Sequence, residues 1–315
     1  MKPGSAIGSA ALLICTFRRP QTFVKLIQSV AALEIPDGLR FSLIIADNNP
    51  EGAWDSYIGP AVSALPWPVH YGHEPVTGYS SARNKAIELA LRTDADAFLF
   101  VDDDMILERT WLREHLRSLE ELEADIVNGR IYGVRERFPH DTRLEKCGAG
   151  NVSFRRRIIA PEGLGLRFDP AFNKLGMEDQ AFFREASRRG AVIKQSDLPL
   201  IYNYYGREDV PEEEIINKMH TTGSMQHNLV ALARREKGLL PATALASKGL
   251  LFAVKGVGLH VLSTIQAMTR QGQRAHKSAL SSRKEFLKMK GRFTGLSGQI
   301  VSRQDVRRSD PSASS

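Results

Sequence analysis

The stretch Ala97-Phe98-Leu99-Phe100-Val101-Asp102-Asp103-Asp104 joins five apolar residues to three carboxylates without a break. Such an apolar run predicts a strand that is buried on both faces, as in a parallel sheet covered by helices. Open α/β sheets bind their ligands at the carboxyl ends of the strands, and acidic oxygens there suit a hard divalent cation that holds an anion. The alternative is a solvated acidic turn that leads into a helix cap.

Strand and helix patterns alternate before and after this stretch. Apolar runs predict strands at 11–15, 41–46, 69–71 and 125–127, and helical spacing predicts helices from residue 20, from a Ser80 or Ser81 cap, and over 110–122. This alternation predicts an α/β fold with a doubly wound, mostly parallel central sheet.

The pattern changes after about residue 130. A glycine-rich strand is predicted at 148–154, where a ligand or another backbone can approach closely. A helix is predicted to begin at the acidic pair Glu178-Asp179, and one or two strands are predicted within 192–205.

Composition indicates a globular chain. Its 315 residues are 42% hydrophobic and 25% charged, which suits one large α/β domain with an appendage. Two cysteines, Cys15 and Cys147, are too few for a disulfide framework and favour a reducing, cytoplasmic setting. We find no secretory signal pattern and no run of about 18 apolar residues that would predict a membrane span.

Charge is concentrated near the C-terminus. Residues 234–315 hold 16 Lys and Arg against 4 Asp and Glu, which gives this segment +12 in a chain of net charge +7. The moderately apolar stretch 239–268 is interrupted by Pro241 and by lysines, and a strongly basic stretch follows it. We therefore expect helices in the interface of an anionic membrane, on the inner face of the cell membrane, and no nucleic-acid partner. The alternative is a helical hairpin packed on the catalytic domain.

Five features occur in order along the chain. They are Thr16-Phe17-Arg18-Arg19-Pro20, Asp47, the segment 78–84 with its Ala82-Arg83-Asn84, the acidic triplet 102–104, and Glu178-Asp179. Together they resemble the family 2 glycosyltransferases of the GT-A fold, over about residues 9 to 205. The chain lacks a Gln-x-x-Arg-Trp motif, so the resemblance implies an enzyme that adds one sugar rather than a processive polymerase.

The resemblance implies a nucleotide-sugar donor and a Mg²⁺ or Mn²⁺ cofactor. A divalent cation offsets the charge that grows on the diphosphate as the glycosidic bond breaks. Asp104 would ligate the metal, Asp102 would lie near the ribose or reach the metal through water, and Asp103 would do either or be solvated. The implied donor-binding residues are Thr16, Arg18, Asp47, Gly78, Arg83, Asn84, Asp102 and Asp103.

Two of these donor residues have structural alternatives. Asp47 would accept a hydrogen bond from the nucleobase, but an Asp after a strand also forms turns with its own backbone. Arg83 would lie beside the diphosphate, but an arginine on a helix surface is the competing interpretation. A late histidine, His220 or His227, could complete the metal site, although a packed or exposed histidine is the simpler interpretation for each.

The acidic pair Glu178-Asp179 resembles the pair from which inverting enzymes of this family take their general base. Asp179 would remove the proton of the acceptor hydroxyl, and Glu178 would orient or bind the acceptor. The alternative is that both carboxylates only stabilise the helix N-terminus. Gly150 and Asn151 would border the acceptor.

These inferences combine into one organisation of the chain. We expect residues 1–8 to form a tail, 9–130 to bind the donor, 131–210 to bind the acceptor and carry the base, 211–295 to form a basic helical extension that associates with the membrane, and 296–315 to be disordered. The predicted function is metal-dependent, inverting transfer of one sugar to a saccharide or lipid-linked acceptor in envelope or exopolysaccharide assembly. The alternatives are a noncatalytic nucleotide-sugar-binding scaffold at the membrane and a nucleotidyltransferase.

Overall fold

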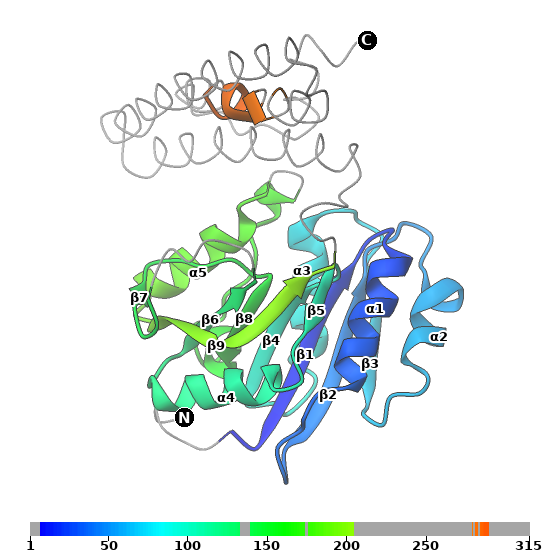
Figure 1. The fold of residues 1–315 in the computed structure, drawn as a ribbon, viewed down its shortest axis with the longest axis horizontal. Coiled ribbons are helices and arrows are strands. Elements are labelled where there is room, and N and C mark those ends of the chain that lie inside the picture. Colours follow the sequence, from blue (N-terminus) through cyan, green and yellow to red (C-terminus); the bar gives the residue numbers. More distant parts are fainter. Residues whose placement is uncertain are drawn as a thin grey trace, which may run out of the picture. The chain divides into compact units, whose positions relative to one another are not determined.

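The structure is a computed structural model that describes residues 7–132, 139–173, 176–204, 279, 281, 282 and 284–289 (Figure 1). The chain divides into two units, one of Met1–Asn173 with Glu178–Gly206 and one of Lys174–Met177 with Arg207–Ser315. In the second unit, residues 284–289 are helical, and Lys288 bonds Glu285 at 3.0 Å. The expected interfacial helices at 239–268, and both His220 and His227, lie outside the described residues.

The first unit alternates strands and helices. Its first half contains β1 (Ser9–Thr16), α1 (Pro20–Ala31), β2 (Arg40–Asp47), a π-helical turn (Trp54–Ile58), α2 (Gly59–Val62), β3 (Val69–His73), α3 (Tyr79–Ala90) and β4 (Ala97–Asp102). Its second half contains β5 (Met105–Leu107), α4 (Trp111–Glu121), β6 (Ile126–Ile131), β7 (Arg143–Leu144), β8 (Asn151–Arg155), α5 (Glu178–Arg188) and β9 (Ile193–Asn203), with 3₁₀ turns at Arg156–Ile158 and Pro170–Phe172.

The described strands form one nine-stranded sheet in the order β3-β2-β1-β4-β8-β6-β9-β5, with β7 paired to β9. Strands β3, β2, β1 and β4 are mutually parallel, as the sequence predicts. Beyond β4 the sheet is mixed, because β8 runs antiparallel to both β4 and β6. The carboxyl ends of four parallel strands therefore share one edge.

Helices cover both faces of this sheet, which is the doubly wound arrangement (Figure 1). Side chains alternate across each strand, so Leu12 of β1 packs with α1 and α4 while Leu13 packs with α3 and α5. In β4, Phe98 and Phe100 fill the second core and lie against Phe154 of β8. The expectation that β4 is buried on both faces is confirmed.

The start of α3 differs from the sequence prediction. Neither Ser80 nor Ser81 caps the helix, because its N-cap is Gly78, which has φ of 153°. The amide of Ser81 is instead bonded by the side-chain oxygen of Asn173 at 2.9 Å. A residue 92 positions away thus supplies the cap, and a local sequence pattern does not contain that information.

Within the described residues, no helix has both the length and the apolar character needed to cross a membrane.

Candidate active site

Three of the predicted residues end neighbouring strands. Thr16 of β1 pairs in register with Asp47 of β2, and Cys15 of β1 pairs with Asp102 of β4. Because these strands are parallel, their ends meet at the same edge of the sheet, which is where open α/β sheets bind ligands. The structure therefore brings the acidic triplet beside the loop that follows β1.

Arg19 holds two carboxylates of the triplet. Its Nη1 donates to Oδ1 of Asp103 at 3.1 Å and to Oδ2 of Asp104 at 2.9 Å. The motif predicts a donor role for Arg18 of this loop, but the φ of Arg18 is 53°, and its guanidinium lies over the Phe17 ring, 5.3 Å from the ring centroid. A donor role for Arg18 stays a prediction, whereas Arg19 is the arginine that contacts the acidic triplet.

Asp103 is not solvated. Its side chain is buried and accepts hydrogen bonds from Thr16 Oγ1 at 2.9 Å and from the amide of Phe17 at 3.3 Å. Burial raises the pKa of Asp103 to about 6, although the charge of Arg19 opposes this shift. The hydroxyl of Thr16 is thus committed to the triplet.

Arg83 joins the other predicted acidic residues. It donates to Glu178 through Nη1 and to Asp102 through Nη2, the latter at 3.4 Å, and it lies over the Phe168 ring. Burial lowers the pKa of Arg83, but the charges of Glu178 and Asp102 raise it by more, so it stays protonated. The side chain is only 11% exposed, which excludes the interpretation of an ordinary surface arginine.

Glu178 lies at the start of α5 and is buried. Burial raises the pKa of Glu178 to about 7, against the opposing charge of Arg83. Among the described residues, its Oε2 has no hydrogen-bond partner. The buried oxygen atom is therefore available to a polar group of a bound molecule.

Asp179 faces the glycine-rich segment before β8. Its Oδ1 accepts from the amide of Gln180 at 2.6 Å, and its Oδ2 accepts from the amide of Ala149 at 3.3 Å. On the other side of this segment, a β-carbon on Gly150 would lie 2.6 Å from Oδ2 of Asp102. Residues 148–150 therefore run between Asp102 and Asp179, and a side chain at position 150 would require the carboxylate of Asp102 to shift.

The side chain of Asn151 points away from this segment into the core. Its Oδ1 accepts from Trp111 Nε1 and His115 Nε2, both at 2.8 Å. Its amide nitrogen donates to the carbonyl oxygens of Arg130 at 2.9 Å and Pro199 at 3.1 Å. All four hydrogen bonds of this amide are made, so the side chain is not available to an acceptor and only its backbone borders the segment.

The carboxylate of Asp47 is also fully bonded. Its Oδ1 accepts from the backbone and the side-chain amide of Asn49, and its Oδ2 accepts from the amide of Ala53 and the hydroxyl of Tyr71. The structure thus shows the turn-forming role that was the alternative for Asp47. A hydrogen bond to a nucleobase would require one of these four donors to give way, and that role stays a prediction.

Helix α3 is tied to the loop that precedes α5. Asn84 exchanges two hydrogen bonds with the backbone of Phe168, both at 2.8 Å. A β-carbon on Gly78 would lie 2.1 Å from the side-chain oxygen of Asn173. Gly78 and Asn84 therefore attach the helix that carries Arg83 to the segment that leads to Glu178. Their partners, Asn173 and Phe168, are distant in sequence, and no local pattern predicts them.

The acidic triplet fits a cation that arrives with a phosphate ligand. Mg²⁺ and Mn²⁺ take oxygen donors, and one or two carboxylates suffice when substrate phosphates complete the coordination. Asp102 is 44% exposed at the edge, and Asp104 lies two residues further on. In the part of the chain that the structure describes, no three acidic, histidine or cysteine side chains converge to hold a metal by themselves.

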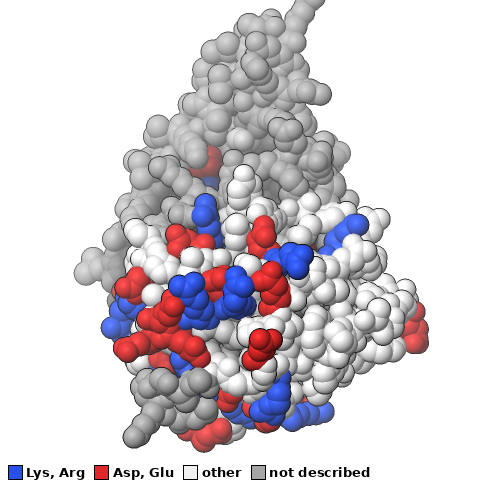
Figure 2. All heavy atoms as spheres, turned by 60° about the horizontal axis from the view of Figure 1, so that its bottom comes forward, with Lys and Arg blue, Asp and Glu red and all other residues white. Residues whose placement is uncertain are grey.

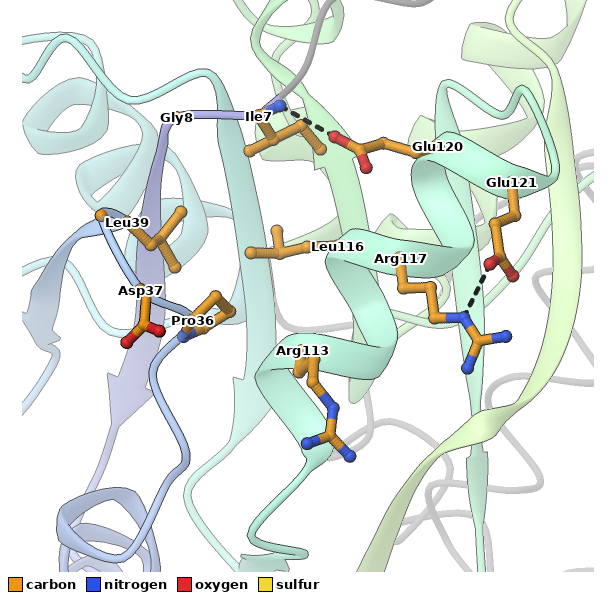
Figure 3. A pocket seen from close by; sticks show the side chains of 11 residues that line it. Ile7, Gly8, Pro36, Asp37, Leu39, Arg113, Leu116, Arg117, Glu120 and Glu121 are labelled. Atoms are coloured by element: carbon orange, nitrogen blue, oxygen red, sulfur yellow. Dashed lines mark hydrogen bonds and ion pairs between the residues drawn. The ribbon is translucent and has the colours of Figure 1, made fainter.

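A hollow lies at the other end of the parallel strands, beside the residues that precede β1 and β2 (Figure 3). It measures about 370 Å³, and Leu39 and Leu116 point into it from opposite walls. Arg113 and Arg117 of α4 also line it and form ion pairs with glutamates at 2.8 Å. Figure 2 shows basic and acidic side chains interleaved over this end of the molecule, and none of the predicted site residues lines the hollow.

Known proteins resemble this chain in sequence and in fold. The family model for glycosyl transferase family 2 matches residues 11–179, from β1 to the start of α5. The succinoglycan biosynthesis protein ExoM of Rhizobium meliloti (strain 1021) is 27% identical over 255 residues, which are 75% of this chain and 79% of ExoM.

Solved structures resemble the fold at low identity. A mannosyltransferase, PcManGT from Pyrobaculum calidifontis in complex with GDP-Man and Mn²⁺, superposes with a TM-score of 0.60 at 13% identity, covering 92% of this chain and 88% of that one. S. aureus TarS 1–349 superposes with a TM-score of 0.52 at 14% identity, covering 92% of each chain. These likenesses show that the chain has the GT-A fold that its motifs predicted.

Proposed function

The chain belongs to glycosyl transferase family 2 and is a glycosyltransferase, and we propose that it moves one sugar from a nucleotide-sugar to an acceptor hydroxyl with inversion at the anomeric carbon. The observation that carries this proposal is the convergence of Asp102, Glu178 and Asp179 around Arg83 and the segment 148–150. The family match favours this chemistry over nucleotidyl transfer and over a noncatalytic scaffold.

The donor side of the proposal lies at the ends of β1 and β4. Asp104, with Asp102 directly or through water, would hold a Mg²⁺ or Mn²⁺ ion, which would supply positive charge to the departing diphosphate. The Mn²⁺ bound by the mannosyltransferase of similar fold supports this assignment. Arg83, kept protonated by its acidic neighbours, adds a fixed positive charge beside Asp102.

Asp179 is the proposed general base. In an inverting displacement, the acceptor oxygen forms a bond to the anomeric carbon while the bond from that carbon to the diphosphate oxygen breaks, and the hydroxyl proton passes to the carboxylate. The amides of Gln180 and Ala149 orient this carboxylate beside the glycine segment, where an acceptor can approach closely. Glu178, whose Oε2 has no hydrogen-bond partner within the described part of the chain, would bind an acceptor or sugar hydroxyl.

We propose a saccharide acceptor, lipid-linked, in envelope or exopolysaccharide assembly at the inner membrane face. The succinoglycan relative supports the polysaccharide class, and the basic C-terminal segment supports the membrane location.

A donor-hydrolysis screen tests the proposed function without knowledge of the acceptor. The purified chain is incubated with UDP-, GDP-, ADP- and dTDP-sugars, each with Mg²⁺, Mn²⁺ or EDTA, and nucleoside diphosphate release is measured. We expect cation-dependent release from one donor class, lost in Asp102→Asn. Undiminished release in EDTA would contradict the metal, and no release from any donor, with or without a mixture of lipid-linked saccharides, would contradict sugar transfer.

A further inference from the structure

Arg19 bridges two adjacent carboxylates with one nitrogen atom. Residues 103 and 104 form the turn between β4 and β5, and this turn aims both side chains at Nη1 of Arg19, at 3.1 and 2.9 Å. A guanidinium nitrogen in this position supplies the positive charge that a divalent cation bound to Asp104 would supply. Arg19 and such a cation therefore compete for the same carboxylate.

The exposure of the three side chains is unequal. The side chains of Asp103 and Asp104 are 7% and 9% exposed, whereas that of Arg19 is 43% exposed. Buried carboxylates need a counter-charge at all times, because an unpaired buried charge is strongly destabilising. The half-exposed arginine side chain can turn toward solvent, whereas the buried carboxylates cannot.

We propose that Arg19 is the internal counter-cation of the acidic triplet, which a divalent cation displaces when the nucleotide-sugar binds. This inference rests on the proposed function, since it takes Asp104 as a ligand of the cation. The displaced guanidinium finds a new anionic partner in the diphosphate, with which arginine forms strong charge-assisted hydrogen bonds. Arg19 is thus a positioning residue that makes cation and donor bind cooperatively.

Cooperativity of this kind is measurable, because the two ligands must strengthen each other's binding by the same factor. A cation that binds without nucleotide must break the contacts of Arg19 with the triplet. The loss of one charge-assisted hydrogen bond lowers the affinity for the cation by about tenfold. When a nucleoside diphosphate binds with the cation, the displaced guanidinium bonds the diphosphate, so the cation loses less affinity. Removal of the guanidinium abolishes the competition and most of the coupling.

The test is a Mn²⁺ titration followed by the electron paramagnetic resonance signal of free Mn²⁺, with the full chain and without substrate turnover. Wild type, Arg19→Gln and Arg18→Gln are titrated with Mn²⁺ alone, and again with UDP and with GDP, with correction for Mn²⁺ bound by free nucleotide. We expect Arg19→Gln to bind Mn²⁺ alone about tenfold more tightly than wild type and to show a smaller gain from nucleotide. Arg18→Gln removes the same charge from the same loop and should change the affinity for Mn²⁺ alone by less than about threefold.

Equal affinities of wild type and Arg19→Gln for Mn²⁺ alone, or equally tightened binding of Mn²⁺ alone in the Arg19 and Arg18 variants, would overturn the role of Arg19. If Arg19→Gln does not fold, Arg19→Lys decides the matter, because it keeps a charge for the buried carboxylates but loses the fork of donors. Tighter Mn²⁺ binding by Arg19→Lys supports the proposal, and unchanged or weaker binding overturns it. Loss of Mn²⁺ binding in Asp104→Asn with no change in Arg19→Gln would overturn the role of Arg19 and leave the proposed function intact. If Asp104→Asn binds Mn²⁺ with the affinity of the wild type, the result contradicts both the role of Arg19 and the metal site of the proposed function.

Discussion

Gly150 leaves room for the carboxylate of Asp102 because it has no side chain. Because a β-carbon there would lie 2.6 Å from Oδ2 of Asp102, the Gly150→Ala variant must displace either this carboxylate or the strand. We expect a loss of nucleoside diphosphate affinity of about tenfold or more, since among the described residues the Asp102 side chain is held only by its 3.4 Å contact with Arg83. Isothermal titration of UDP and GDP with Mn²⁺ measures this loss.

Gly148 provides the matched control for Gly150. A β-carbon at Gly148 would lie 3.4 Å from Oδ2 of Asp179, which is an ordinary contact. The Gly148→Ala variant should therefore bind nucleoside diphosphate like the wild type. Equal affinity losses in the two variants would contradict a specific contact between Gly150 and Asp102.

At this scale, the sequence predicts the acidic groups better than their partners. Asp102, Glu178 and Asp179 are recognisable because each follows or begins a regular element. Arg19 could not be distinguished from Arg18, because the left-handed backbone of Arg18, with φ of 53°, decides which of the two side chains meets the triplet. The inward orientation of Asn151 could not be predicted from the sequence either, because it depends on neighbours 36 and 40 positions away.

Helix α4 and strand β8 are joined by a buried polar network that contains His115. The Nε2–H of His115 donates to Asn151 Oδ1, which has no proton to offer, and so Nδ1 accepts from the hydroxyl of Ser153 at 2.9 Å. Burial lowers the pKa of His115 to about 4. The network fixes the start of β8 and with it the segment that runs between Asp102 and Asp179.

This network predicts a specific acid sensitivity. The pKa of His115 is lower in the folded state than in the unfolded chain, so the unfolded chain binds more protons between about pH 6.5 and 4. Stability is therefore lost as pH falls through this window, and one such group contributes roughly 2 kcal/mol of loss between pH 7.5 and 5.0. Urea unfolding at the two pH values should show this loss in the wild type and a smaller loss in His115→Gln.

His70→Gln is the control for this measurement. His70 lies on the edge strand β3, and the variant keeps the buried histidine, so it should lose as much stability on acidification as the wild type. A His115→Gln variant with the full wild-type pH dependence would show that the network does not cause the acid sensitivity.

The long elements follow from hydrophobic periodicity, and the short ones do not. Helices α1, α3, α4 and α5 and strands β1, β2 and β4 lie close to their predicted positions, because each buries apolar side chains at a regular spacing. Strands β5 and β7, of three and two residues, are too short for a pattern to predict them, and both pair with β9. The antiparallel insertion of β8 between β4 and β6 is likewise a tertiary feature.

At the scale of the whole molecule, the two edges of the sheet differ in character. The carboxyl edge gathers the acidic triplet, Arg19 and Arg83, whereas the amino edge carries interleaved charges that pair with each other (Figure 2). The excess positive charge of the chain lies instead in the sequence after residue 234. We therefore expect membrane attraction to come from that segment and not from the arginines of α4.

Vesicle flotation tests the expected membrane attraction. The full chain should float with vesicles of phosphatidylcholine and phosphatidylglycerol but not with phosphatidylcholine alone, and about 0.5 M salt should release it. Replacement of Lys277, Lys284 and Lys290 by Gln should weaken binding by about 100-fold, at about 1 kcal/mol per charge. The matched replacement of Arg109, Arg113 and Arg117 should have no such effect, and equal effects of the two sets would contradict a C-terminal membrane surface.

We propose that sugar transfer takes place at the carboxyl ends of the parallel strands with Asp179 as the general base. The most direct test is the rate of transfer by Asp179→Asn with the donor found in the hydrolysis screen, beside its affinity for the same nucleoside diphosphate with Mn²⁺. The asparagine has the shape of aspartate but cannot take the proton, so we expect kcat to fall by roughly 10² to 10⁴ while nucleotide affinity stays within about threefold. Transfer at an undiminished rate by this variant, with nucleotide affinity unchanged, would show that Asp179 is not the general base.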